Sequence, residues 1–428
     1  MSYKEKLLQD NRLTTTAQVV VDKYFDKLSS ELTIDPNLIT EWALVCFPFV
    51  NKPQGRLERN FYKQFKESLL NEAIKLSMDI KSNQFKYDLF REGYLIDPDG
   101  QTRRIAKQNV RDKLLDRILL VGLNKLSAPL FTGYNSYAYM PNTSPSLAVY
   151  DLIRDYRRNN IKQIVTLDIK NFFLNIEHEP LIQKLKLITQ DELAIKLITE
   201  QLKLSVIKSD GSKEKNESKG LYYGPVLSPW LSNLYMHAIH EFFETSIMQS
   251  INDKALYYRY SDDQAILLEN PNDKEKVIEM LSGKLAELGL SINNDKTQEF
   301  LADNTGTINN FTWLGYDILL GKDKFKISIS SKSKYRFMNS IKPEIDALKN
   351  DNLFKAYIKD QCKGRLVSML KGFINFYKIT NDYEEISSLV YEILDMIEDV
   401  KLRDELELIL IKAIRSKVNE GCSLLTLL

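Results

Sequence analysis

The tetrapeptide formed by Tyr260, Ser261, Asp262 and Asp263 places two adjacent carboxylates between two apolar segments. The surrounding residues 255–268 are predicted to fold as a strand, a tight polar turn and a second strand. Adjacent carboxylates repel each other, and each raises the pKa of the other. A divalent cation removes this repulsion, and carboxylate oxygens suit Mg²⁺. The tetrapeptide therefore indicates a metal site at the tip of a hairpin, although a solvated acidic turn has the same composition.

A third acid, Asp168, lies near the end of the β-branched segment 163–169, which is typical of a buried strand. If this strand lies beside the 255–268 hairpin, Asp168 and Asp262 can face each other across the sheet surface. Three carboxylates from two strands could then hold a pair of metal ions, one activating a hydroxyl and the other neutralising a departing pyrophosphate. The alternative is that Asp168 caps the helix predicted to follow it.

The elements that must position these acids follow from hydrophobic periodicity. Helices are predicted within residues 1–95, 107–128, 144–158, 229–249 and 273–288, and from about residue 333 to the end. Besides the strands already named, β structure is predicted at 94–100, where a strand runs into a turn, and from 311 to 316. The order strand, helix, hairpin, helix and strand over 160–318 predicts an α+β fold, with helices on one face of an antiparallel sheet.

The composition is that of an ordinary globular protein and makes several function classes improbable. The chain has 428 residues, enough for two or three lobes, and no apolar run that could span a bilayer. Its 59 basic and 58 acidic residues leave a net charge of +1, so any contact with nucleic acid must be confined to a local cleft. The N-terminus lacks the pattern of a signal peptide, and three widely separated cysteines indicate a reducing cytoplasm rather than a disulfide framework.

Seven segments resemble, in order, the motifs of reverse transcriptases. The first and third catalytic motifs correspond to residues 168–176 and 259–263, and the second and fourth to residues 220–233 and 288–297. Residues 313–316 resemble the primer grip. Two upstream segments, 102–112 and 135–141, resemble fingers blocks of the group II intron-like bacterial branch. The resemblance covers roughly residues 95–318 and implies a right-hand polymerase fold with fingers, palm and thumb.

The resemblance implies a metal site and a general acid. Asp168, Ile169, Asp262 and Asp263 would bind the two catalytic ions, with Mg²⁺ as the expected ion and Mn²⁺ as an alternative. The three aspartates and Lys296 would be catalytic, with Lys296 protonating or stabilising the leaving pyrophosphate. The alternative for Lys296 is a solvated lysine after a turn.

The resemblance also implies a nucleotide pocket. Arg103 would clamp the triphosphate through bidentate phosphate contacts, and Phe173 would block a ribose 2′ hydroxyl and so favour deoxynucleotides. Gly224 would let the backbone approach the nucleotide closely. The alternatives are a core aromatic for Phe173 and a surface cation for Arg103.

The departures from the family pattern concentrate near this pocket. Tyr222 and Tyr223 stand where the second motif usually has Pro-Gln, so Tyr223 is expected to stack on the incoming nucleotide in place of the glutamine. The fingers segment has Lys107 and Gln108 instead of Ile-Pro, and Met140 replaces an arginine. These changes leave open how ordinary templated copying would proceed.

The expected organisation is a helical segment over 1–95, a fingers and palm domain over 96–318, and a helical thumb and C-terminal domain over 319–428. Because no endonuclease, integrase or RNase H segment is recognisable, the chain is similar to the stand-alone defence-associated reverse transcriptases of bacteria. That resemblance implies cDNA synthesis in the cytoplasm during phage infection, often on a dedicated noncoding RNA. Expected partners are the RNA template, dNTPs, the DNA product, and a partner protein or second copy, with no membrane. The alternatives are template-independent or protein-primed DNA synthesis, and a non-catalytic RNA-binding subunit.

Overall fold

The computed structural model of the chain describes residues 34–47, 50, 56–97, 100–215, 218–252, 254–322, 324–349 and 355–425. The helices expected before residue 34 and the turn expected at 98–99 lie outside the described residues. No helix in the described part of the chain combines the length and apolarity needed to cross a bilayer.

The central sheet carries the predicted hairpin. Its strands are β6 (Ala255–Tyr260), β7 (Asp263–Leu268), β3 (Gln163–Leu167) and β8 (Gln298–Leu301), in that spatial order and antiparallel throughout. The pairing of β3 with β7 confirms that the strand before Asp168 lies beside the hairpin. The sheet and its surrounding helices confirm the predicted α+β class.

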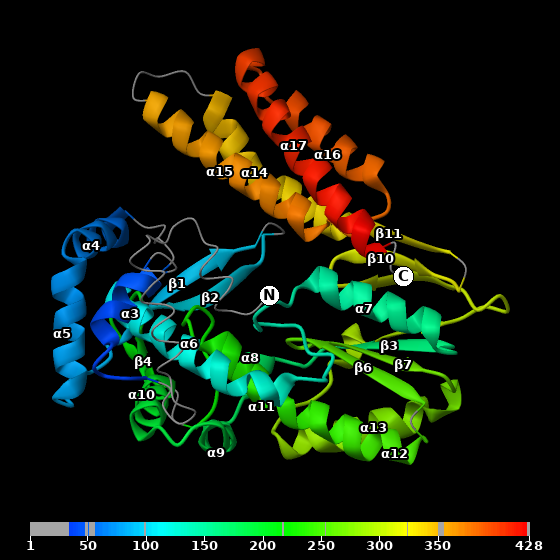
Figure 1. Cartoon of the computed structure of the whole chain (residues 1–428), viewed down its shortest axis with the longest axis horizontal. Coiled ribbons are helices and arrows are strands. Elements are labelled where there is room, and N and C mark those ends of the chain that lie inside the picture. Colours follow the sequence, from blue (N-terminus) through cyan, green and yellow to red (C-terminus); the bar gives the residue numbers. More distant parts are fainter. Residues whose placement is uncertain are drawn as a thin grey trace.

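Helices cover both faces of this sheet, so the expectation of one covered face is wrong. α11 (Ser228–Phe242) and α13 (Lys274–Glu287) share a core with Val165 and Ile266, while α7 (Pro145–Arg158) shares the opposite core with Ile164 and Leu267. Figure 1 shows α7 and α13 on opposite sides of the strands. The physical reason is that alternate residues of β3 and β7 are apolar on both faces, and each face needs a cover.

A second sheet packs near the N-terminal helices α3 (Ile39–Cys46), α4 (Arg56–Glu67) and α5 (Leu69–Lys81). Its strand order is β2-β1-β4-β5, built from β1 (Phe90–Ile96), β2 (Thr102–Lys107), β4 (Ser205–Ile207) and β5 (Lys213–Lys215). The last residues of the segment expected to be helical, from Phe90 onward, are therefore strand, because β1 pairs with β2. The three-residue strands β4 and β5 are too short to show a period in the sequence.

Four helices, α6 (Val110–Phe131), α7, α11 and α13, begin within a few residues of the predicted starts. The helices α9 (His178–Ile188) and α10 (Glu192–Leu202) were not predicted. The shorter elements are α8 (Phe172–Asn175), the π-helix η2 (Phe243–Ile247), α12 (Met248–Ser250), and the 3-10 turns η3 (Pro271–Asp273) and η4 (Asn294–Lys296). The side chain of Asn109 caps α6 by accepting a hydrogen bond from the backbone of Asp112.

The C-terminal part consists of a small antiparallel sheet and a helical bundle. The sheet contains β9 (Ile308–Trp313), β10 (Tyr316–Leu320) and β11 (Phe325–Ile329), and the bundle contains α14 (Ser331–Lys349), α15 (Lys355–Phe376), α16 (Tyr383–Asp395) and α17 (Val400–Leu425). Phe373 of α15 stacks on Phe337 with ring centroids 3.9 Å apart, so this aromatic belongs to the core. The division at 95/96 and 318/319 stays a proposal, and both boundaries fall inside strands.

Candidate active site

The structure brings the three predicted acids together at one end of the central sheet. Asp168 follows β3, Asp262 lies in the turn between β6 and β7, and Asp263 begins β7. Because Leu167 pairs with Gln264, the chain register places Asp168 next to Asp263. The charge of Asp168 acts on both Asp262 and Asp263, so the three carboxylates form one electrostatic cluster.

The protonation behaviour of this cluster reflects its crowding. Burial raises the pKa of Asp262, and the charge of Asp168 adds to the effect. Asp263 keeps an exposed face, yet partial desolvation and the charges of Asp262 and Asp168 raise the pKa of its carboxyl to about 7. Within the described residues, no side-chain or backbone donor makes a hydrogen bond to the Asp263 carboxylate. Its oxygens are available to a cation.

The carboxylates of this site suit a divalent ion whose remaining ligands are water or substrate oxygens. In the described ranges, no three His, Cys, Asp or Glu side chains form a complete ligand set by themselves. Mg²⁺ is normally held by one or two carboxylates together with waters and substrate phosphates, so a partial set of oxygens is what such a site requires. Ile169 has a buried hydrocarbon side chain, so only its main-chain carbonyl oxygen could join Asp168, Asp262 and Asp263.

Lys296 and Asn293 hold Asp168 in place. One carboxylate oxygen of Asp168 accepts hydrogen bonds from Lys296 Nζ at 3.0 Å and from Asn293 Nδ2 at 3.2 Å. The backbone N–H of Asn293 donates to the carbonyl of Asp168 at 2.8 Å. Asp168 therefore does not cap the next helix, whose N-cap residue is Asn171. The role of Asn293 was missed, although it lies in the segment that resembles the fourth motif.

Arg259 is a further residue that sequence reasoning left without a role. Its side chain is fully buried behind the β6–β7 turn, and burial lowers its pKa to about 10. The guanidinium donates to Ser136 Oγ at 2.8 Å and to the Ser261 carbonyl at 3.4 Å. Ser261 has a left-handed φ of 60°, so this donor braces the strained residue of the turn. The alternation of β6 could have indicated its burial, because Arg259 lies between two tyrosines that point the other way.

The loop that follows Gly220 is tied to β2 rather than free. Ala106 N–H donates to the Tyr223 carbonyl at 2.7 Å, and Val226 N–H donates to Gln108 Oε1 at 3.0 Å. Gly224 has a φ of 112°, and a Cβ there would lie 2.5 Å from the Ala106 carbonyl oxygen. The close approach that requires glycine is therefore to the protein's own strand, and contact of Gly224 with a nucleotide stays a prediction.

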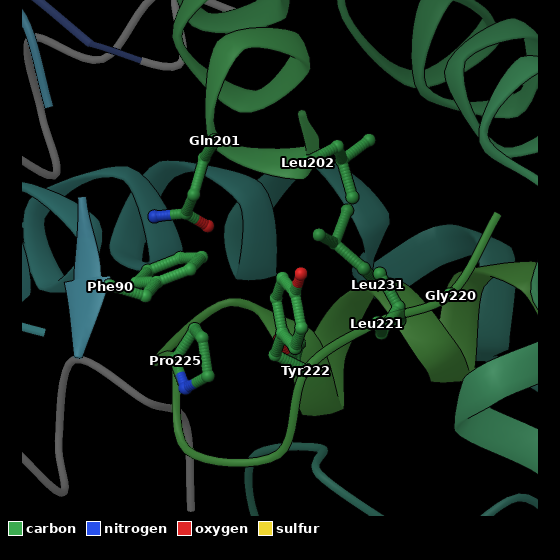
Figure 2. A pocket seen from close by; sticks show the side chains of 9 residues that line it. Phe90, Gln201, Leu202, Gly220, Leu221, Tyr222, Pro225 and Leu231 are labelled. Atoms are coloured by element: carbon green, nitrogen blue, oxygen red, sulfur yellow. The ribbon is translucent and has the colours of Figure 1, made fainter. Parts of the chain in front are cut away.

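The two consecutive tyrosines of this loop point in different directions. Figure 2 shows Tyr222 inside a small pocket, beside Pro225 and facing Phe90, whose ring it meets edge-on at 5.6 Å. Tyr223 instead stacks on Phe173, with ring centroids 4.6 Å apart and ring planes 17° apart. Phe173 covers one face of Tyr223, and stacking of Tyr223 on a nucleotide stays a prediction. Phe173 is 5% exposed, as expected of a core aromatic, and its contact with a ribose also stays a prediction.

Arg103 is a partly exposed cation whose charge acts on Tyr223. Its guanidinium makes an ion pair with Asp97 at 2.6 Å, and about half of its side chain (53%) is exposed. Burial raises the pKa of Tyr223, the charges of Asp262 and Asp168 raise it further, and the charge of Arg103 lowers it. The Tyr223 hydroxyl therefore lies within electrostatic reach of both the acid cluster and Arg103.

Several known proteins are similar to this chain. The chain is 22% identical over 395 residues to a putative COX1/OXI3 intron 1 protein of Saccharomyces cerevisiae, covering 75% of this chain and 46% of that protein. It is 24% identical to the group II intron-encoded protein LtrA of Lactococcus lactis subsp. cremoris, covering 54% and 37% respectively. The chain thus spans less than half the length of these curated relatives.

Two solved structures of telomerase from Candida tropicalis also resemble the chain. They give TM-scores of 0.44 and 0.48 at 15% and 13% identity, and cover 61% and 81% of this chain and 60% and 65% of those chains. The model of the family described as reverse transcriptase (RNA-dependent DNA polymerase) matches residues 95–318. This match covers just over half of the chain and contains all three acids, Lys296 and the Tyr223 loop, so the protein belongs to the reverse transcriptase family.

Proposed function

We propose that the chain is an RNA-directed DNA polymerase that makes cDNA. The observation that carries this proposal is the convergence of Asp168, Asp262 and Asp263 at the end of one sheet, inside the domain that matches the family. Members of the family use divalent metal ions, and bound Mg²⁺ would activate a primer hydroxyl and neutralise charge on the pyrophosphate. The identity of the ion as Mg²⁺ rather than Mn²⁺ is part of the proposal.

The other residues of the site have roles that follow from their contacts. Lys296 is held by Asp168 but is 64% exposed, so it can donate a proton to a leaving group beside the acids. The guanidinium of Arg103, which is paired with Asp97 and 53% exposed, offers a fork of N–H donors that can bind a triphosphate. Phe173, which stacks against Tyr223, would limit the space at the sugar.

The biological role that we propose is antiphage defence in the bacterial cytoplasm, with a dedicated noncoding RNA as template. Its support is the resemblance to stand-alone bacterial enzymes, together with a balance of 59 basic and 58 acidic residues that suits contact with one bound RNA better than with long nucleic acid. The proposed partners are this RNA, dNTPs, the DNA product, and a partner protein or a second copy of the chain.

A second candidate is template-independent or protein-primed synthesis by the same site. The observation that favours it is the Tyr223 side chain, which fills part of the pocket with an aromatic ring where the family usually has glutamine. A ring in this place restricts the room for a base-paired nucleotide.

The test is incorporation of labelled dNTPs by the purified protein with Mg²⁺, before and after nuclease treatment. DNA made only when RNA is present supports the first proposal, and DNA made after nuclease treatment supports the second. No incorporation under any condition would leave the non-catalytic RNA-binding subunit. Asp262→Ala should abolish synthesis, whereas Asp395→Ala, at an exposed acid of α16, should not. Synthesis by Asp262→Ala would overturn the assignment.

A further inference from the structure

Tyr223 covers one face of the residue expected to select the sugar. The rings of Tyr223 and Phe173 are nearly parallel, 17° apart, at a centroid distance of 4.6 Å. Phe173 is 5% exposed, whereas Tyr223 is 38% exposed. Between these two rings, solvent and any ligand therefore meet Tyr223 first, and Phe173 lies behind it.

The backbone holds the two rings at this spacing. Leu221 N–H donates to the Phe173 carbonyl at 2.7 Å, and Ala106 N–H donates to the Tyr223 carbonyl at 2.7 Å. Gly224 abuts the Ala106 carbonyl and leaves no room for the loop to move toward β2. Rotation of the Tyr223 side chain would uncover one face of Phe173 and lose the stacking contact.

The exposed part of Tyr223 lies within electrostatic reach of the groups that would bind a nucleotide. The charges of Asp262 and Asp168 raise the pKa of its hydroxyl, and the charge of Arg103 lowers it. In the proposed function, the triphosphate contacts Arg103 and, through the metal ions, the acids, so a bound nucleotide lies close to the tyrosine ring.

We propose that Tyr223 is the specificity-determining residue that contacts the sugar of the incoming nucleoside triphosphate, with Phe173 as the support behind it. This inference rests on the proposed function and deepens it. A ribose 2′ hydroxyl meets the Tyr223 ring, and Phe173 selects against ribose directly only when Tyr223 is absent. The two residues therefore act as one unit, and their substitutions are not additive.

The experiment is a double-substitution cycle with Tyr223→Gln, Phe173→Val and the combined variant. The readout is the ratio of the affinities for dCTP and CTP, measured by calorimetry with Ca²⁺ so that no synthesis is needed. Phe173→Val should change the ratio less than about threefold when Tyr223 is present, and about tenfold or more in the Tyr223→Gln background. Tyr391→Gln, at an exposed tyrosine of α16, is the matched control.

Two outcomes overturn the inference. One is an effect of Phe173→Val on the dCTP/CTP affinity ratio that is equal in the wild-type and Tyr223→Gln backgrounds. The other is a dCTP/CTP affinity ratio that Tyr223→Gln does not change, either in the wild-type protein or in the Phe173→Val protein. Because Phe173 is buried, the thermal unfolding of each variant is compared with that of wild type. If Phe173→Val does not fold, the dCTP/CTP affinity ratio of the Tyr223→Gln protein tests the inference, since Tyr223 is partly exposed. A preference for dCTP over CTP in a protein that makes no DNA would reject the proposed function but not this inference. DNA synthesis by a protein in which the effects of Tyr223→Gln and Phe173→Val are additive would reject this inference but not the proposed function.

Discussion

Two groups of carboxylates in this molecule share a raised pKa but differ in their surroundings. At the end of the central sheet, Asp263 keeps an exposed face and receives no hydrogen bond within the described residues. In α6, Asp116 is fully buried, and burial raises its pKa to about 7. Asp116 accepts hydrogen bonds from Tyr87 Oη at 3.0 Å, from Gln108 Nε2 at 2.7 Å, and from Gln201 Nε2 at 2.6 and 2.7 Å.

The difference shows what separates a structural acid from a candidate metal ligand. Neutral donors satisfy the oxygens of Asp116, so a cation would find no free lone pair and no path to the carboxylate. Gln108 also accepts from Val226 N–H, so this buried cluster supports the loop that carries Tyr223. The Asp263 carboxylate, by contrast, receives no hydrogen bond within the described residues, and the cations that act on it are Lys296 and Lys332. A shifted pKa alone does not distinguish the two groups, whereas the presence of donors does.

The largest effect is expected at Asp263, the carboxylate that receives no hydrogen bond within the described residues. Asp263→Asn should lower DNA synthesis at least about a thousandfold, because metal clamping of a phosphoryl transfer supplies several kcal/mol. The same change relieves repulsion with Asp262 and Asp168, so the metal-free protein should not lose stability. Mg²⁺ should raise the unfolding temperature of wild type more than that of Asp263→Asn, because ligand binding stabilises the folded state. An equal Mg²⁺ shift in both proteins would remove Asp263 from the metal site.

Substitution of the buried Asp116 is expected to lower stability. Asp116→Ala leaves donors of Tyr87, Gln108 and Gln201 without an acceptor, and should lower the free energy of unfolding by about 3 kcal/mol. Urea denaturation measures the change, with Asp395→Ala as the exposed control expected to stay within about 0.5 kcal/mol. A loss smaller than about 1 kcal/mol for Asp116→Ala would contradict a structural role.

Lys296 makes an ion pair with Asp168 in the cluster of three acids. Lys296→Ala should lower kcat about a hundredfold, because a positioned general acid contributes roughly that much. Lys296→Arg keeps the positive charge near Asp168 but holds its proton too tightly to donate it. Single-turnover synthesis distinguishes the two roles, since restoration by arginine would indicate an ion pair and not proton transfer.

The smallest change between successive measurements is expected in the pH dependence of stability. The folded state keeps a proton on Asp116 up to about pH 7, whereas the unfolded chain releases it near the ordinary value of about 4. The free energy of unfolding should therefore fall as pH rises between these values, by at most about 1.4 kcal/mol per pH unit from this group, and level off above them. Asp116→Asn cannot titrate, so urea unfolding of both proteins from pH 5 to pH 8 isolates the contribution. Parallel pH profiles would show that Asp116 does not titrate in this range.

Local patterns sufficed for the elements that hold the acids. The alternating aromatic and apolar residues around Tyr260–Asp263 predict the hairpin, and the β-branched residues before Asp168 predict its partner strand. Both are short-range signals, and the structure confirms them. The organisation into segments ending at 95 and 318 was not tested in the same way and stays a proposal.

Side-chain contacts between distant segments could not be predicted in this way. The sequence shows that Arg259 precedes the acidic turn but not that its guanidinium lies buried against Ser136, more than a hundred residues earlier. The same holds for Asp116, which meets Gln201 across 85 residues. Such contacts depend on which face of each element meets which neighbour.

The sequence by itself determined the chemistry available to this protein: three acids on adjacent strands, a lysine that can reach them, and a loop with tyrosines where glutamine is usual. Only the tertiary structure decided which of these groups remain open and which are covered. Tyr223 stacks on Phe173 and Tyr222 meets Phe90, in a loop that a hydrogen bond from Ala106 of β2 to the Tyr223 carbonyl holds in place. A residue's type sets the interactions that it can make, while the packing of distant segments determines which of them it makes.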